Sequence, residues 1–435
     1  MSEPDSRLQA AADRGDPEAL CRLGVDALHR QQFGAAERWL RQGADAGSAA
    51  ARNALAAMYL YGMGVTADVR RAVELYEAAS EAGHADACFT LANLYFVGAA
   101  VARDDDRAGR LLRKAAVGGS PGALRVLGFI HARRPNDDGG GQKLATACFT
   151  AAAAAGDPLA MHIAGMRCLH GNGTDADAGR ARYWFEQAAA AGVALSVRRL
   201  ASLSEVTAEP PSPESQADAL DDAADFQWPA QVLEPLQPIS RAPRIGFVDN
   251  VLTGEECDYL IMLAEPSLMA SLTLDPISGK MVSSTLRTSR SMNFQPVTKD
   301  IALHLVERRL ATLAEMPVDH AEPLAVLHYR KGEEYKPHYD YFTPEAMAKE
   351  PRLSASGQRL VTTFVYLTDV ERGGGTDFPR LMKTVEPRRG RALLMHNCDP
   401  DRRPYPATLH AGLPVVAGEK WLVTLWFRER PFVQG

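Results

Sequence analysis

A fixed internal repeat constrains the fold of the first half of this chain more than any other feature. An alanine-rich segment that closes on glycine recurs at intervals of 36, 36, 37 and 36 residues. The glycines are Gly47, Gly83, Gly119, Gly156 and Gly192. A period of this length indicates a solenoid of stacked supersecondary units. We expect each glycine to end a helix in the left-handed conformation, which glycine adopts without strain.

Within each unit, the apolar residues have the spacing of two helices. In the second unit, Leu55 and Tyr59 precede a turn at residues 62–64, and Leu75 and Tyr76 follow it. Three- and four-residue spacing places such side chains on one face of a helix. Each unit is therefore predicted to be a helical hairpin, and the N-terminal region an α-helical solenoid.

The units resemble Sel1-like repeats, which are helical hairpins of the tetratricopeptide type. The match is carried by Leu-Ala-x-Met-Tyr-x-Tyr-Gly-x-Gly from Leu55 and by Ala-x-x-Leu-Tyr-x-Ala-Ala from Ala72. The pattern departs around residues 133–141, where three consecutive glycines replace the usual turn, so one loop there is expected to be irregular. The first unit, residues 11–46, lacks the Gly-x-Gly turn, which is typical of a capping repeat.

The repeat half is expected to bind a partner rather than to catalyse a reaction. Solenoids of this kind present an extended concave surface, and most of them bind polypeptides. We therefore expect a protein partner on the repeats. The alternative, a scaffold or dimerisation element without a ligand of its own, stays open.

Composition and charge limit the classes of protein to consider. The 435 residues are 46% apolar and carry a net charge of −6, which gives no basic footprint for nucleic acid. The six cysteines are scattered without a CxxC pair, which argues against a zinc or disulfide framework. The N-terminal residues are polar, and no apolar run reaches the length of a membrane span. These features predict a cytoplasmic protein with no membrane contact.

Residues 203–241 differ in composition from both flanking regions. They are rich in proline and acidic residues, a composition that favours an extended segment without a core. We predict a linker here, docked on one of the domains through Phe226 and Trp228. The chain then divides into a repeat array at 1–202, this linker, and a second domain at 242–435.

Four residues of the second domain suggest a metal centre with a co-substrate pocket. His338 and Asp340 are two residues apart, and alternate residues of a β-strand project from the same face. With His410 from another strand, they can form the two-histidine, one-carboxylate triad of non-haem Fe(II). Lys420, on what we interpret as the next strand, can pair with the far carboxylate of a dicarboxylic co-substrate.

The motifs around these residues resemble those of the prolyl 4-hydroxylase family of 2-oxoglutarate- and Fe(II)-dependent dioxygenases, over about residues 242–432. They are Tyr-Lys-Pro-His-Tyr-Asp from Tyr335, Arg-Leu-Val-Thr-Thr from Arg359, Gly-Gly-Gly-Thr-Asp-Phe-Pro from Gly373, Leu-His-Ala-Gly from Leu409, and Gly-Glu-Lys-Trp from Gly418. The resemblance implies a double-stranded β-helix (jelly roll). It also implies Fe(II), 2-oxoglutarate and O2, with ascorbate as an accessory.

The resemblance assigns further roles residue by residue. Tyr329 would hydrogen-bond the co-substrate, and Thr424, four residues after Lys420 on the same strand face, would line its pocket. Arg287, Tyr335 and Arg359 would lie near the substrate peptide, with mobile loops at 283–290 and 342–357. Alternatives stay open: Tyr329 as a core aromatic, and the two arginines as structural ion-pair partners. We expect His328 and His396 to have no role in the site.

The local pattern of the second domain agrees with an α + β fold. Val251–Ala264 is predicted to be a helix, with Thr253 as N-cap and Glu256 as its capping-box partner. The β-rich segments are Leu324–Tyr329, Leu360–Leu367, Arg391–Met395 and Trp421–Phe427.

The leading hypothesis is a peptidyl-proline hydroxylase that releases succinate and CO2, with repeats that recruit the substrate protein. A second hypothesis keeps the chemistry but changes the target to another side chain or a small molecule. A third is a repeat-based interaction protein with an inactive oxygenase domain, against which the intact triad and Lys420 argue. A zinc hydrolase fits least, since zinc sites usually carry more His or Cys ligands.

Overall fold

The chain forms two compact units, each with a hydrophobic core of its own. The computed structural model describes residues 3–98, 101–134, 139–210, 222–274, 281–283, 286–349 and 351–432. One unit comprises Met1–Pro229 with Lys299–Ile301, and the other comprises Ala230–Thr298 with Ala302–Gly435. Across the described residues, no helix combines the length and the apolar character that a membrane span requires.

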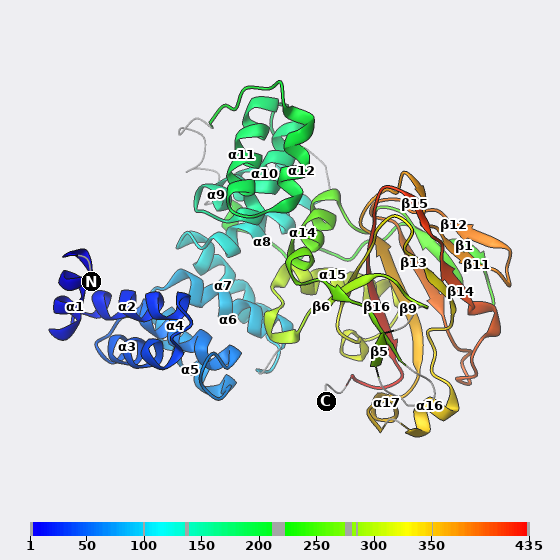
Figure 1. Cartoon of the computed structure of the whole chain (residues 1–435), viewed down its shortest axis with the longest axis horizontal. Helices are drawn as coiled ribbons and strands as arrows, with labels where there is room; N and C mark the ends of the chain where they lie inside the picture. Colours follow the sequence, from blue (N-terminus) through cyan, green and yellow to red (C-terminus); the bar gives the residue numbers. More distant parts are fainter. Residues whose placement is uncertain are drawn as a thin grey trace. The chain divides into compact units, whose positions relative to one another are not determined.

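The first unit is a series of helical hairpins, as the repeat predicted (Figure 1). Helices that follow one another in sequence pack against each other. The helices are α1 (Glu3–Asp13), α2 (Pro17–His29), α3 (Phe33–Asp45), α4 (Ala49–Tyr61), α5 (Val69–Glu81), α6 (Ala85–Val97), α7 (Asp105–Val117), α8 (Pro121–Ala132), α9 (Gly140–Ala154), α10 (Pro158–His170), α11 (Ala178–Ala190) and α12 (Ala194–Leu200).

The recurring glycines end helices in the predicted conformation. All five have φ between 79° and 98°, in the left-handed region. Gly47, for example, stands two residues beyond the end of α3 and turns the chain towards α4. Small residues also bring the helices together: a Cβ on Gly43 would lie only 2.9 Å from the Cβ of Ala51. The predicted irregular loop at 133–141 is described only in part, because residues 135–138 lie outside the described residues.

The linker docks on the repeat array through the two predicted aromatic residues. Residues 222–229, here called the linker strap, lie within the first unit, whereas residues 211–221 lie outside the described residues. Phe226 is 2% exposed, and the Trp228 ring lies 4.3 Å from the ring of Phe96 on α6. Arg113 on α7 donates to the Phe226 carbonyl at 2.9 Å and covers its ring. The contact face is therefore apolar, and the strap backbone is held by hydrogen bonds.

Replacing Phe226 with alanine is expected to detach the strap from the array. Truncation of a buried phenylalanine typically costs about 3 kcal/mol or more, so the first unit should melt at a lower temperature. Thermal unfolding and hydrogen exchange at residues 222–229 measure the two effects. Gln227→Ala, an exposed position on the same strap, is the matched control. Equal stability of the two variants would contradict the docking contact.

The second unit contains two principal antiparallel sheets (Figure 1). The larger sheet has the order β1-β2-β13-β9-β16-β7-β6-β3, and the smaller has the order β12-β11-β14-β8. The strands of the larger sheet are β1 (Gln237–Ser240), β2 (Ile245–Val248), β3 (Met269–Ala270), β6 (Arg290–Asn293), β7 (Ala325–Tyr329), β9 (Arg359–Tyr366), β13 (Ala392–His396) and β16 (Lys420–Arg428). Those of the smaller sheet are β8 (Tyr335–His338), β11 (Thr376–Phe378), β12 (Lys383–Val385) and β14 (His410–Gly412).

Two short strand pairs and four α-helices also belong to the described part of the unit. The pairs are β4 (Leu272–Leu274) with β5 (Met281–Ser283), and β10 (Arg372–Gly373) with β15 (Val415–Ala417). The helices are α14 (Gly254–Ala264), α15 (Ile301–Ala314), α16 (Pro344–Lys349) and α17 (Pro351–Ser356). The predicted strands are confirmed, as is the Thr253–Glu256 capping box of α14. Helix α15, which lies between β6 and β7 in the chain, was not predicted.

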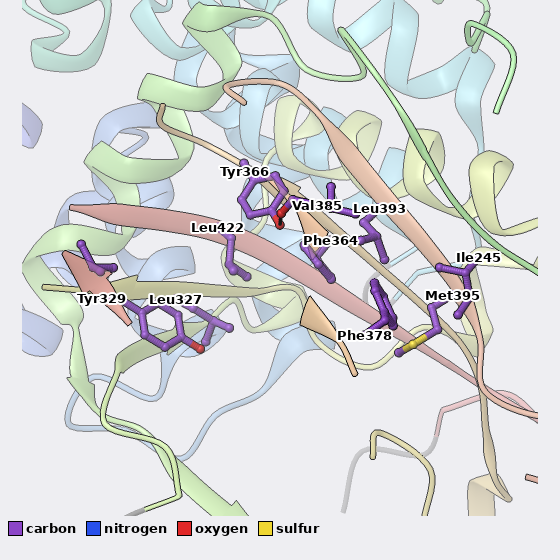
Figure 2. Close-up of a cluster of buried hydrophobic side chains, with 11 residues drawn as sticks. Ile245, Leu327, Tyr329, Phe364, Tyr366, Phe378, Val385, Leu393, Met395 and Leu422 are labelled. Atoms are coloured by element: carbon purple, nitrogen blue, oxygen red, sulfur yellow. Dashed lines mark hydrogen bonds between the residues drawn. The ribbon is translucent and has the colours of Figure 1, made fainter. Parts of the chain in front are cut away.

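The core of this unit joins the two sheets (Figure 2). Strands β7, β9, β13 and β16 contribute side chains from the larger sheet, and Phe378 and Val385 come from β11 and β12 of the smaller one. Apolar side chains from both sheets therefore meet in one cluster, as in a jelly roll. The same cluster supplies the inner wall of the pocket described next.

Candidate metal centre and co-substrate pocket

Strand pairing brings the two predicted histidine ligands together. His338 is the last residue of β8, His410 is the first of β14, and the two are directly opposite in the antiparallel register. Asp340 lies beyond the strand, in a bend, so the explanation from strand alternation was wrong in detail. The bend nevertheless returns its carboxylate to the site. One ligand atom from each of the three residues lies within 4.8 Å of the others, in the described part of the chain.

Backbone carbonyls fix the tautomers of both histidines. Nδ1 of His338 lies 2.9 Å from the Lys336 carbonyl, and Nδ1 of His410 lies 3.0 Å from the Thr408 carbonyl. A carbonyl only accepts, so each Nδ1 carries a proton, and in the neutral ring the lone pair is then on Nε2. The Nε2 atoms lie 3.7 and 3.8 Å from the oxygens of Asp340. The three ligand groups therefore converge on one point.

The protonation states also suit a divalent cation. Burial, with the nearby His410 charge, lowers the pKa of His338 to about 3, so the imidazole is neutral at pH 7. Burial opposes ionisation of Asp340, but the cationic side chains around it lower the pKa of its carboxyl below the usual value. Two imidazoles and one carboxylate fit Fe(II). The residues present therefore match the metal that the motif predicted.

Lys420 occupies the adjoining part of the pocket. It is the first residue of β16 and lies opposite Tyr329 of β7 in the register. The short strand β15 comes between His410 and Lys420, so placing Lys420 on the next strand was wrong. Its side chain is 2% exposed, and Nζ lies 5.3 Å from the centre of the Tyr329 ring. Burial lowers the pKa of this ammonium to about 7, although Glu386 acts in the opposite direction.

One pocket contains the triad, Lys420 and most of the predicted site residues. Thr424 lines it as predicted, because alternate residues of β16 face the same side. Leu327, Phe364 and Leu422 belong both to its wall and to the core cluster (Figure 2). The lining residues are Arg287, Leu327, Tyr329, Tyr335, His338, Asp340, Thr362, Phe364, Thr376, His410, Gly412, Lys420, Leu422, Thr424 and Trp426.

The residues predicted to contact substrate lie in two different environments. Tyr335 stacks on the His338 ring at 3.5 Å, and the Arg287 guanidinium lies 5.2 Å from the centre of the Tyr335 ring. Arg359 is bound by Glu322 through two hydrogen bonds of 2.7 Å, which fits the structural ion-pair alternative. The described pocket lining does not include Arg359. Its role at the substrate stays a prediction.

The two predicted mobile loops have regular contacts where they are described. In the first, the Leu286 carbonyl accepts from the Lys336 amide at 2.9 Å, while Ser284 and Thr285 lie outside the described residues. The second contains helices α16 and α17. His328 has no part in the site, as expected, because it stacks on Trp421 and bonds to Glu419.

Three lining residues whose side chains can form hydrogen bonds were not predicted from the sequence. Thr362, Thr376 and Trp426 all face the pocket. Thr362 and Phe364 alternate along β9, so the period of two was the signal that could have identified Thr362. Trp426 continues the Lys420, Leu422, Thr424 series on β16. Thr376 carried no comparable signal, because its strand has only three residues.

The fold and the site together define a 2-oxoglutarate- and Fe(II)-dependent oxygenase. Residues 324–428 match the model of the 2OG-Fe(II) oxygenase superfamily. The repeat half matches the Sel1 repeat at residues 17–48, 49–84, 85–120 and 158–193. The interval between the third and fourth matches contains the segment 133–141, where the sequence departs from the repeat pattern.

Comparison with individual proteins identifies the family. Probable prolyl 4-hydroxylase 3 of Arabidopsis thaliana is 39% identical over 207 residues, which cover 43% of this chain and 70% of that protein. Prolyl 4-hydroxylase 5 of the same plant is 38% identical, with 45% and 72% covered. The viral collagen prolyl hydroxylase of Paramecium Bursaria Chlorella virus-1 is 30% identical, with 42% and 95% covered and a TM-score of 0.34. The chain belongs to the prolyl 4-hydroxylase family of 2OG-Fe(II) oxygenases.

Proposed function

We propose that the protein hydroxylates a peptidyl proline, consuming O2 and 2-oxoglutarate and releasing succinate and CO2. The observation that carries the proposal is one pocket holding both the His338, Asp340, His410 cluster and the buried Lys420. Bound Fe(II) would supply the activation of O2, coupled to oxidation of the co-substrate. Proline as the target is supported by the named activity of the relatives.

The chain's own residues then have separable tasks. His338, Asp340 and His410 would hold the metal. Lys420 would pair with the far carboxylate of 2-oxoglutarate in a buried setting where a charge-assisted bond is strong. Apolar side chains of the core wall exclude water around this pair, which protects a reactive centre from side reactions. The enzyme thus contributes binding and orientation, and the cofactor supplies the oxidising chemistry.

The co-substrate should bind more weakly as pH rises above about 7. Burial lowers the pKa of Lys420 to about 7 in the free pocket. A dicarboxylate binds the protonated form, so above that pH each molecule bound must also take up a proton. Above pH 7 the affinity for 2-oxoglutarate should then fall by up to about tenfold per pH unit. Below pH 7 the titration of Lys420 should leave this affinity unchanged. Anaerobic titration at saturating metal measures the slope.

Lys420→Arg is the matched control for this pH dependence. A guanidinium stays charged across the range, so the variant should bind 2-oxoglutarate with little change between about pH 7 and pH 9. A wild-type affinity that stays constant over the same range would contradict a titrating ammonium in the pocket.

The test of the proposed function is succinate formation with concurrent modification of a peptide. Anaerobically iron-loaded protein is given 2-oxoglutarate, a panel of proline-containing peptides and then air, with His338→Ala as control. Turnover stimulated by one peptide, with one oxygen added to its proline, supports the proposal. Turnover stimulated only by other peptides or small molecules would favour a different target. No turnover and no 2-oxoglutarate binding would leave an interaction protein with an inactive oxygenase domain.

We also propose that the Sel1 repeats bind a protein partner, either the substrate or a regulator. The repeat matches and the solenoid architecture support this role. Ascorbate dependence and a cytoplasmic location stay predictions.

A further inference from the structure

Two buried polar residues behind Asp340 have no part in the function described so far. Thr362 on β9 is 1% exposed, and Asn397, directly after β13, is fully buried. The Thr362 hydroxyl lies 2.8 Å from Oδ2 of Asp340, and Nδ2 of Asn397 lies 3.0 Å from the same hydroxyl. Polar groups are costly to bury without partners. Here they form a chain that ends on a metal ligand.

The direction of each hydrogen bond in this chain follows from the group at its end, the Asp340 carboxylate. A carboxylate that binds a metal only accepts hydrogen bonds, so the Thr362 hydroxyl donates to Oδ2 of Asp340. That uses the single proton of the hydroxyl, so its oxygen can only accept from Asn397. The Asn397 amide therefore presents its NH2 group to Thr362, which settles which of its two ends is nitrogen.

The backbone holds Asn397 firmly in place. Its N–H donates to the Leu360 carbonyl at 2.8 Å, and its carbonyl accepts from the Tyr405 amide at 2.9 Å. Strand β13 pairs with β9 in a register that sets Met395 opposite Thr362. Asn397, the first donor of this hydrogen-bond chain, is thus fixed to the larger sheet, whereas Asp340 lies in a bend.

We propose that Thr362, oriented by Asn397, is a positioning residue that holds the Asp340 carboxylate in its metal-binding orientation. The inference rests on the proposed function, because it assumes that Asp340 is a ligand. The backbone conformation of a bend does not by itself fix the side-chain torsions of Asp340. The hydroxyl ties Oδ2 to the rigid sheet and thereby keeps both oxygens facing the histidine Nε2 atoms. Outer hydrogen bonds of this kind commonly account for about 10- to 100-fold in metal affinity.

A merely structural role would leave the asparagine unexplained. Oδ1 of Asn397 is buried and has no hydrogen-bond partner among the described residues. An apolar side chain of similar size would avoid that cost. The amide therefore has a disadvantage for stability, and its donation to Thr362 is the feature that distinguishes it from an apolar residue.

The test is metal affinity, measured on the full chain without turnover. Mn(II), which does not react with the co-substrate and O2 as Fe(II) does, is titrated anaerobically and free Mn(II) is followed by EPR. Thr362→Val removes the hydroxyl and should weaken binding by about 10- to 100-fold. Thr362→Ser keeps the hydroxyl and should restore wild-type affinity. Adding 2-oxoglutarate to the Fe(II)-loaded variants gives a second readout, the visible absorption of the complex, which should shift only in Thr362→Val.

Thr363→Val is the matched control on the same strand. Thr363 is as buried as Thr362, but its hydroxyl faces the Leu425 carbonyl at 3.4 Å instead of the site. Equal affinity of Thr362→Val and wild type would overturn the inference, and so would equal losses in the variants at positions 362 and 363. Failure of the wild type to bind either metal would instead overturn the proposed metal site itself.

Discussion

Replacing Asp340 with asparagine is expected to reduce succinate formation to less than about one hundredth of the wild-type rate. Loss of an outer hydrogen-bond partner alone typically costs about 10- to 100-fold, and this change removes a ligand charge. Asparagine has nearly the shape of aspartate, so the buried site should keep its packing. The change leaves two imidazoles facing a neutral amide, which binds Fe(II) weakly.

The measurement pairs anaerobic metal titration with the rate of succinate release. Asp377→Asn, on β11 of the smaller sheet, is the control for a neutralised carboxylate outside the triad. We expect the control to behave as wild type. Full turnover by the Asp340 variant would exclude the triad as the metal centre.

Replacing Lys420 with methionine is expected to have opposite effects on binding and on stability. The variant should bind 2-oxoglutarate on the order of 100-fold more weakly, because removing one partner of a buried charge pair costs about 3 kcal/mol or more. The apo protein should melt at a higher temperature, because Lys420 is 2% exposed and burial disfavours its ammonium. Methionine fills similar space without a charge.

Calorimetric titration and thermal unfolding of the same samples check the two effects. Lys383→Met on β12, an exposed strand lysine, controls for the loss of one positive charge. A simple loss of fold would lower both affinity and melting temperature, which distinguishes it from the expected pattern. Unchanged 2-oxoglutarate affinity would exclude Lys420 as the carboxylate partner.

Sequence patterns predicted those parts of the fold that depend on local chemistry. Gly47 and its four counterparts follow helix ends as expected, because glycine adopts the left-handed conformation without strain. The capping box at Thr253 and Glu256 was also predictable from the sequence, because both partners lie within one turn of the helix. Helix α15 was not predicted, because its buried apolar residues Ile301, Leu305 and Leu310 are not confined to one face of the helix.

The candidate ligands could be predicted from the sequence, but the residues around them could not. His338, Asp340, His410 and Lys420 were identified from spacing and resemblance, and the structure brings them into one pocket. Asn397 could not be identified, because its contact with Thr362 depends on how β13 pairs with β9 across the sheet. The bend at Asp340 was also hidden, since nothing in a His-x-Asp pair distinguishes a strand from its end.

The direct pairing of His338 with His410 links metal binding to completion of the fold. The two residues come from strands far apart in sequence, and a shift of one residue in an antiparallel pair turns a side chain to the opposite face. A nascent or misregistered chain therefore has no three-ligand site. If these residues bind Fe(II) as proposed, only molecules whose smaller sheet has assembled in this register would present all three ligands to the metal.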